Sequence, residues 1–388
     1  MSADLVVAGA GIVGAACAYY AAREGLSVTV VDRGPIAGGT TGAGEGNILV
    51  SDKEPGPELD LALLSNREWR ELAGLPLDGE TFAAAVELEH KGGLVVASRQ
   101  ASLDGLDRLA AEQRSLGVEA VAVPARRLHD HEPHLAHDLA GGYLYPQDMQ
   151  VQPMLAAAHL LRMARASGAT VLPHEPVTGF LRDGERVTGV RTPRRKIPAG
   201  AVLNATGTWA GELAALAGVP VPVAPRRGFV LVTEPLPPMI RRKVYFADYI
   251  ADVASDSAAL QTSAVVEGTK AGTVLIGASR ERVGFDRAFS LPALRLLAAG
   301  ALRLFPVLDG VAVLRAYRGF RPYCPDHLPV IGPDPRAPGL HHACGHEGAG
   351  IGLSLGTARL VTQALTGGTP DIDTRPFRPD RFGTEAAA

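Results

Sequence analysis

The stretch DLVVAGAGIVGAACAYYAAREGLSVTVVD, residues 4–32, decides the fold. An apolar strand runs into Gly9-Ala10-Gly11-Ile12-Val13-Gly14, an alanine-rich helix follows, and a second apolar strand ends at Asp32. In this order, Gly9 makes a tight turn, Gly11 lets backbone approach a pyrophosphate, and Gly14 lets helix and sheet pack closely. The helix N-terminus supplies N–H groups, and Asp32 would accept ribose hydroxyls. The sequence therefore predicts a dinucleotide-binding unit. Its further contacts are predicted at Ile12, Val13 and Arg33.

Overall composition narrows the class of protein. The chain has 388 residues and a formal net charge of -3, and 46% of its residues are hydrophobic, which is typical of a soluble globular protein of two domains, or of one domain with a large insertion. The absence of a lysine or arginine run argues against nucleic acid as a partner. No apolar run reaches the roughly 20 residues of a membrane span, and residues 1–11 carry no secretion signal. We therefore expect a cytoplasmic protein with a small-molecule substrate.

Cysteine and histidine usage argues against a metal or iron–sulfur centre. The three cysteines, Cys17, Cys324 and Cys344, form no CxxC pair. Four histidines lie in LHDHEPHLAHD, residues 128–138, but proline breaks this segment and no regular spacing fixes metal ligands. We predict no metal, so the electron carrier should be organic.

The dinucleotide is predicted to be FAD rather than NAD. A two-nucleotide reductase normally carries a second fingerprint, and none appears. Instead the glycine-rich segment GGTTGAGEGN, residues 38–47, follows Asp32 closely, and its backbone can lie against a large flat ligand. The predicted cofactor contacts in this loop are Thr40, Thr41, Gly44, Gly46 and Asn47.

Helical and strand patterns alternate along the rest of the chain. Residues 58–71, 102–116, 151–167 and 290–305 have helical spacing, and residues 86–98 indicate two strands around a Gly92-Gly93 turn. Residues 201–207 predict a strand that ends in Asn-Ala-Thr-Gly beside the cofactor, and residues 225–280 alternate as in an antiparallel sheet. The C-terminal segment predicts a strand, a glycine-rich turn and a helix whose N-terminus faces the cofactor.

These patterns predict an α/β fold, in which a Rossmann-like FAD-binding domain is interleaved with a mostly antiparallel β-sheet substrate domain (α+β). The predicted FAD-binding domain comprises residues 1–83, 146–224 and 316–388. The predicted substrate-binding domain comprises residues 84–145 and 225–315.

An ordered set of motifs resembles one known family. GAGIVG with Asp32, GTTGAGEGN, HEPV, NATGTWAG, GFRPYCPDHLPVIGP and GHEGAGIG look like the D-amino-acid oxidase superfamily of FAD proteins, in the branch of glycine oxidase and sarcosine oxidase. The resemblance covers nearly the whole chain and looks most like D-hydroxyproline dehydrogenase and the flavin subunits of opine-type dehydrogenases. Sarcosine oxidases attach FAD through a cysteine several residues before a Pro-Asp pair, whereas Cys324 immediately precedes Pro325. Non-covalent FAD is therefore expected.

The resemblance and the predicted elements also assign roles to particular residues. By resemblance, Arg321 in the Gly-x-Arg-Pro motif is expected to grip a substrate carboxylate, which suits a bidentate guanidinium. Tyr245 and Tyr249 are candidates for a second contact to that carboxylate, and His346 is a candidate for tuning the cofactor. Further cofactor contacts are expected at Val177, Ala205, Thr206, Gly207, Trp209, Gly345, Glu347, Gly348, Gly350, Ile351 and Gly352. Arg226 and Arg280 are predicted to be ordinary surface residues.

The predicted activity is oxidation of a small amino or imino acid, such as D-proline, 4-hydroxy-D-proline or another secondary amine. Hydride would pass to flavin N5 and an imine would leave. Three alternatives stay open: a glycine- or sarcosine-type oxidase that produces hydrogen peroxide, a flavin subunit that needs an electron-transfer partner, and a non-catalytic FAD-binding protein. The oxygen-activating lysine of sarcosine oxidases has no counterpart in residues 251–263, which favours a dehydrogenase.

Overall fold

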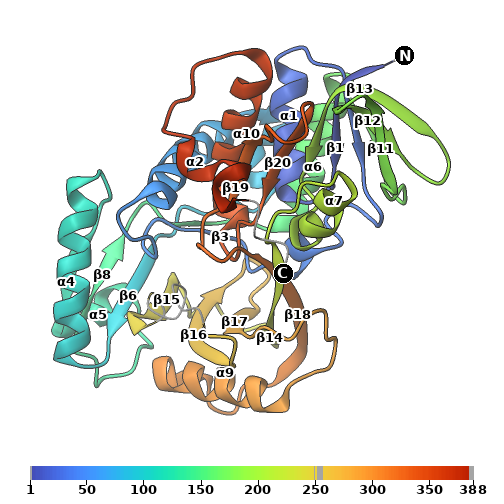
Figure 1. Ribbon diagram of the computed structural model, residues 1–388. Coiled ribbons are helices and arrows are strands. Elements are labelled where there is room, and N and C mark those ends of the chain that lie inside the picture. The colour runs from blue at the N-terminus through green and yellow to red at the C-terminus, as the bar shows by residue number, and fades with distance from the viewer. Residues whose placement is uncertain (1, 249, 251–256, 384–388) are drawn as a thin grey trace.

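The N-terminal motif lies in the first of two eight-stranded sheets. The computed structural model, drawn in Figure 1, describes residues 2–248, 250 and 257–383. Five strands of the first sheet run parallel in the order β10 (Thr170–Leu172), β2 (Val28–Val31), β1 (Ala3–Ala8), β13 (Lys196–Asn204) and β20 (Leu340–Cys344). Three strands are added through antiparallel pairs: β12 (Arg186–Arg191) beside β13, β11 (Gly179–Asp183) beside β12, and β19 (Val330–Pro333) beside β20.

Helices cover both faces of this sheet. On one face α1 (Ile12–Arg23) packs against α10 (Gly350–Thr366) and α6 (Pro153–Ala166), and α2 (Pro57–Ala73) packs against α10. The inward side chains Leu5 and Val7 of β1 belong to this core, whereas Val6 belongs to a separate core that includes Leu213 of α7 (Ala210–Leu216). This alternation along β1 is the period-2 pattern of a strand buried on both faces.

The second sheet is mostly antiparallel. Its order is β18 (Val313–Tyr323), β14 (Ala224–Thr233), β17 (Val274–Arg280), β16 (Gln261–Gly268), β15 (Lys243–Phe246), β6 (Gly93–Ala97), β8 (Gly141–Tyr145) and β7 (Val121–Pro124). Only the pair β15 and β6 is parallel among the strands described. The helix α9 (Leu291–Leu304) packs on β14, β16 and β17, and α4 (Gln100–Ser115) packs on β6 and β8. Figure 1 shows this sheet with α9 below the first sheet and its helices.

Short elements lie between the longer strands and helices. They are two strand pairs, β3 (Asn47–Ile48) with β9 (Met149–Gln150) and β4 (Pro76–Leu77) with β5 (Glu80–Thr81), and two short helices, α3 (Phe82–Ala85) and α5 (Leu128–His131). Turns of 3-10 helix are η1 (Thr40–Ala43), η2 (Ala125–Arg127), η3 (Gly207–Trp209), η4 (Pro306–Leu308), η5 (Arg375–Phe377) and η6 (Pro379–Phe382). Within the described ranges, no helix has both the length and the apolar character needed to cross a membrane.

The end of η1 and the residues that follow it lie directly on the second sheet, where two glycines carry no side chain. A Cβ atom on Gly319 of β18 would lie 2.7 Å from the Cβ of Ala43, and a Cβ atom on Gly277 of β17 would lie 2.1 Å from Oε1 of Glu45. A side chain at Gly319 would displace Ala43, and one at Gly277 would displace the carboxylate of Glu45. The contact brings residues from both sheets to one place.

The predicted fold class is confirmed, and the four predicted helices appear with shifted ends as α2, α4, α6 and α9. The prediction of two strands in residues 86–98 was wrong, because β6 is the one strand there. Upstream of it, Glu87 has a positive φ of 53° and Glu89 forms an isolated bridge with Gln150. A left-handed residue interrupts an extended run, so no second strand forms.

The close approach of α1 to the preceding turn predicts a stability effect. A Cβ atom on Gly14 would lie 2.0 Å from the carbonyl oxygen of Gly9, whereas a Cβ atom on Gly74 would have no neighbour within 4 Å. We expect Gly14→Ala to lower the free energy of unfolding by about 1–3 kcal/mol through overpacking. Gly74→Ala should change it by less than about 0.5 kcal/mol. Urea unfolding measures both, and equal effects of the two substitutions would contradict the packing described.

Candidate functional site

A cavity of about 460 Å³ lies at the carboxyl ends of β1, β2 and β13, where parallel sheets bind ligands. We call it the first cavity. The predicted residues that line it are Gly9, Gly11, Ile12, Val13, Asp32, Arg33, Thr40, Thr41, Gly44, Asn47, Val177, Ala205, Thr206, Gly207, Trp209, Arg321, His346, Glu347, Gly348, Gly350 and Ile351.

The turn between β1 and α1 forms an open cradle in this cavity. Gly9 has a φ of 116°, and a Cβ atom there would lie 2.3 Å from the carbonyl oxygen of Ala205. The N–H of Ile12, the first residue of α1, donates to Oγ1 of Thr41 at 3.0 Å. The N-terminus of α1 thus faces the cavity with its positive dipole end, and residues at the N-terminus of α10 line it too. The site therefore fits a dinucleotide with a pyrophosphate at α1.

Asp32 has a structural role in addition to the predicted ribose contact. Its Oδ2 accepts the N–H of Ala10 at 2.7 Å, and its Oδ1 accepts the N–H of Gly34 at 2.7 Å. Each carboxylate oxygen has two lone pairs, so both can still accept a hydroxyl. Asp32 fixes the glycine-rich turn to the end of β2.

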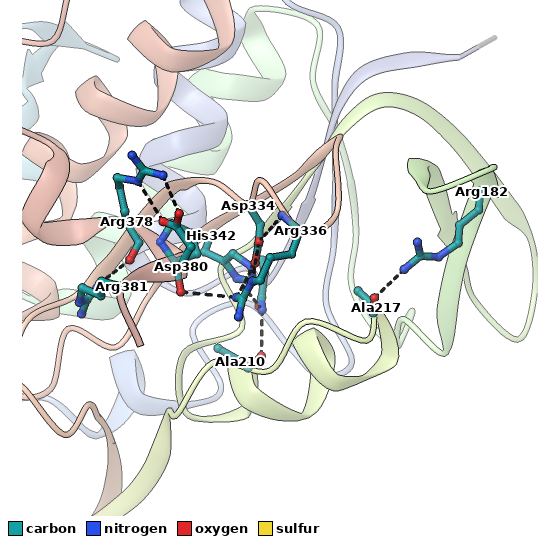
Figure 2. Close-up of polar contacts among 11 residues, drawn as sticks. Arg182, Ala210, Ala217, Asp334, Arg336, His342, Arg378, Asp380 and Arg381 are labelled. Carbon is teal, nitrogen blue, oxygen red and sulfur yellow. Dashed lines mark hydrogen bonds and ion pairs between the residues drawn. The ribbon is translucent and has the colours of Figure 1, made fainter. Parts of the chain in front are cut away.

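A buried polar network holds the predicted cofactor segment 204–207. Nδ2 of Asn204 donates to the carbonyl oxygen of Ala210 at 2.9 Å and lies 3.3 Å from Nδ1 of His342, while Oδ1 of Asn204 accepts from Thr206 Oγ1 at 2.7 Å. Because Nδ1 of His342 must then accept, its Nε2–H donates to Asp334, 3.2 Å away. Figure 2 shows His342, Asp334 and Ala210 in this network. Bonds from His342 and Arg336, which oppose the effect of burial, keep the pKa of Asp334 below its usual value.

Stacked rings lie at the edge of the first cavity. The guanidinium of Arg33 lies 3.6 Å from the ring centre of Trp209, and Phe285 stacks on Trp209 with ring centres 5.3 Å apart and an interplanar angle of 5°. Phe285 comes from the segment after β17 and was missed, because no local pattern links it to Trp209. The stack joins chain segments from both sheets.

A second cavity of about 290 Å³ adjoins the first. Asn47, Arg321, Glu347 and Gly348 line both cavities. The rest of its wall comes from residues 49–58, from the ends of β14 and β17, from the start of α10, and from Ile250, His327 and Leu328. Its lining is rich in charged side chains, whereas much of the first cavity is lined by glycine and backbone.

Three arginines from neighbouring strands line the second cavity. Arg321 of β18 is the register partner of Arg226 of β14, and Arg280 ends β17. The prediction that Arg226 and Arg280 are surface residues was wrong: their exposed fractions are 1% and 5%. Like charges opposite each other in a sheet repel, and the Glu347 carboxylate, 3.2 Å from Arg226, offsets this. Nη1 of Arg321 donates to the carbonyl oxygen of Ser279 at 2.7 Å, which orients its guanidinium.

Some predicted residues lie elsewhere. Tyr245 is fully buried outside both linings, with its hydroxyl 2.6 Å from Oγ of Ser51. Its position therefore gives no support to a substrate contact. Tyr249 lies outside the described residues. Gly352 lines the second cavity, while the lining of neither cavity contains Gly14, Gly46 or Gly345.

A buried charged cluster in the second cavity was missed. Nζ of Lys53 lies 3.1 Å from Asp52 and 3.2 Å from Glu58. Burial raises the pKa of Glu58, and Lys53 opposes that shift. In the sequence these residues lie in the charged run SDKEPGPE, which follows β3 and extends into α2. Such a run resembles an exposed loop, so the buried cluster was not predicted. Within residues 2–248, 250 and 257–383, no group of three or more His, Cys, Asp and Glu side chains could hold a metal ion.

His346 predicts a pH dependence of stability. Burial lowers the pKa of His346 from 6.5 to about 3, and its Nε2 lies 3.0 Å from Oγ1 of Thr357. Between these two pH values the unfolded chain holds a proton that the folded chain lacks, so stability falls as the pH drops below 6.5.

Between pH 4 and 6.5, we expect His346→Gln to reduce the slope of the unfolding free energy against pH. The reduction should be at most the contribution of about one proton. His341, whose pKa burial lowers to about 4, stays in both proteins as an internal reference. Urea unfolding across this range measures the slope, and identical slopes would contradict a neutral, buried His346.

Known proteins match the chain over its whole length. The family described as FAD dependent oxidoreductase matches residues 4–364. Hydrogen cyanide synthase subunit HcnC of Pseudomonas aeruginosa is 32% identical over 99% of this chain and 97% of its own length. The crystal structure of glycine oxidase from Geobacillus kaustophilus has a TM-score of 0.87 and 26% identity, and covers 98% of this chain and 99% of its own. That of L-proline dehydrogenase from P. horikoshii has a TM-score of 0.88 at 22% identity, covers 98% of both chains, and so supports the fold. The chain belongs to the FAD-dependent oxidoreductases of the D-amino-acid oxidase superfamily.

Proposed function

We propose that this FAD-dependent oxidoreductase oxidises the C–N bond of a small amino or imino acid, with a secondary amine such as D-proline or 4-hydroxy-D-proline as its substrate class. The observation that carries the proposal is Arg321, whose guanidinium lies where the two cavities meet. A planar guanidinium held by the Ser279 carbonyl is suited to a carboxylate. The 26% identical glycine oxidase, which acts on an amino acid by its name, supports this choice.

In this proposal the two cavities have separate tasks. FAD occupies the first cavity, held without a covalent bond by the residues predicted for it, and the substrate occupies the second. Cys324 is fully buried and outside the linings of both cavities, which supports non-covalent binding. The domain boundaries predicted from the sequence remain a prediction, and the pairing of β18 with β14 favours assigning β18 to the substrate-binding part.

The chain's own contribution is positioning and electrostatics. Bound FAD would supply the two-electron acceptor for the substrate C–H bond. Arg321 would hold the carboxylate and so fix the distance of the α-carbon from the first cavity. The N-terminus of α10 would stabilise negative charge that develops on the cofactor side. No side chain is required as a nucleophile.

The natural electron acceptor has two candidates. HcnC is named as a subunit, and all three cysteines of this chain are buried and free, which favours a dehydrogenase that passes electrons to a separate carrier. Lys53 favours the oxidase instead. It is a buried lysine that lines the second cavity, and it lies outside residues 251–263, where the sequence has no counterpart of the oxygen-activating lysine. It keeps the peroxide-producing oxidase as the second candidate.

Substitution of Arg321 tests the carboxylate assignment. We expect Arg321→Ala to raise the concentration of amino acid that half-saturates flavin reduction by roughly 10- to 100-fold, since a charge-assisted pair is lost. The control Arg318→Ala removes a guanidinium from the same strand that lies over Phe289, and should leave the half-saturation unchanged. Anaerobic titration of the flavin absorbance measures both. An unchanged value in Arg321→Ala would contradict the assignment.

The rate of reoxidation decides between the two acceptors, because each reduced flavin that oxygen reoxidises yields one hydrogen peroxide at any rate. After one anaerobic reduction by substrate, we expect the protein to reoxidise slowly in air and rapidly when an artificial electron acceptor such as a quinone is added. Fast reoxidation with a full equivalent of peroxide, slowed by Lys53→Met, would instead establish the oxidase.

A further inference from the structure

Glu347 and His327 have an unusual backbone conformation and contact each other. Within the described ranges, six non-glycine residues have a positive φ, among them His327 at 58° and Glu347 at 46°. The left-handed region is disfavoured for a residue that carries a Cβ atom. The two side chains meet, with Nδ1 of His327 lying 2.8 Å from Oε1 of Glu347. Both residues of this contact therefore have a strained backbone. In proteins such strain commonly occurs at functional sites.

The Glu347 carboxylate is fixed from two sides. Nη1 of Arg226 donates to Oε2 at 3.2 Å, and His327 contacts Oε1. A carboxylate has about four acceptor positions, so these two bonds leave it able to accept more. Its side chain is 12% exposed and lines both cavities. Glu347 is therefore a rigid acceptor that a ligand can reach.

Arg321 lies next to this carboxylate along the cavity wall. A Cβ atom on Gly348 would lie 3.4 Å from Nε of Arg321, and the N–H of Glu347 donates to the carbonyl oxygen of Pro322 at 3.1 Å. The place where the two cavities meet thus carries a guanidinium and a carboxylate on adjoining segments. Two other charged groups lie in this region: Glu58 of α2, which interacts with Glu347, and Arg280 of β17, which interacts with Arg226. A guanidinium beside a carboxylate complements an amino acid, which carries both charges.

We propose that Glu347 accepts a hydrogen bond from the substrate amine while Arg321 holds the substrate carboxylate, so that two opposite charges orient the α-carbon. This rests on the proposed function. Arg226 and His327 act as positioning residues, because they hold the carboxylate rather than meet the substrate. A two-point grip of this kind selects amino acids over carboxylic acids that lack the amine, since Glu347 would be left without its partner.

Matched ligands separate this role from a structural one. The probes are D- and L-proline and the two enantiomers of tetrahydrofuran-2-carboxylate, in which an oxygen replaces the N–H. Binding is measured anaerobically from the flavin spectrum, as reduction or as a shift of the band. In Glu347→Gln we expect proline to bind roughly 10- to 100-fold more weakly, since a charge-assisted bond is lost. Tetrahydrofuran-2-carboxylate should bind as well as before or better. Arg321→Ala should weaken both probes.

Controls keep the result decisive. Glu112→Gln removes an exposed acid on α4 and should change neither affinity. If Glu347→Gln fails to retain FAD, His327→Gln is used in its place. We expect this second variant to bind proline more weakly than the native protein does, by a smaller factor than expected for Glu347→Gln, and to bind tetrahydrofuran-2-carboxylate as before. Equal weakening of both probes in either variant, or no weakening, would overturn the inference while leaving the proposed function intact. If the native protein binds none of the four probes, both the proposed function and the inference fall.

Discussion

The contact of residues 40–47 with the face of the second sheet is the constraint on which the rest depends. Ala43 and Glu45 can lie on β18 and β17 because Gly319 and Gly277 carry no side chain there. A third glycine on the neighbouring strand, Gly228 of β14, leaves room for Arg321, since a Cβ atom at Gly228 would lie 2.1 Å from its Nη1. A larger residue at any of these three glycines would displace Ala43, Glu45 or Arg321 from its present position. The same contact makes the two cavities adjoin.

Where the two cavities adjoin, largely buried side chains of opposite charge lie close to each other. Arg226 and Arg321 face each other across two strands, and Glu347 offsets the repulsion through Arg226. Burying these charges is costly unless they are paired, and the site pairs them while leaving a carboxylate and a guanidinium beside the space for a ligand. A small zwitterion fits that distribution better than an uncharged or singly charged molecule does.

Much of the site could be predicted from the sequence because its signals are local. The turn from Gly9 to Gly14, the acid at Asp32 and the loop 38–47 have spacings that follow from short-range geometry, and most of these residues line the first cavity. The second cavity was harder, since Arg226 and Glu347 are 121 residues apart and their contact depends on how strands pair. The buried Arg226, Arg280 and Lys53 were missed because charged residues at strand ends and in loops are usually exposed.

The most direct test of the account is whether amino acids reduce the bound flavin. The purified protein is mixed anaerobically with D-proline, L-proline, 4-hydroxy-D-proline and sarcosine, and with pyrrolidine, which has the ring and amine of proline but no carboxylate. The account predicts that at least one of the amino acids bleaches the visible flavin band rapidly and that pyrrolidine does not. The account would be contradicted if pyrrolidine bleached the band as fast as proline does, or if none of the compounds bleached it.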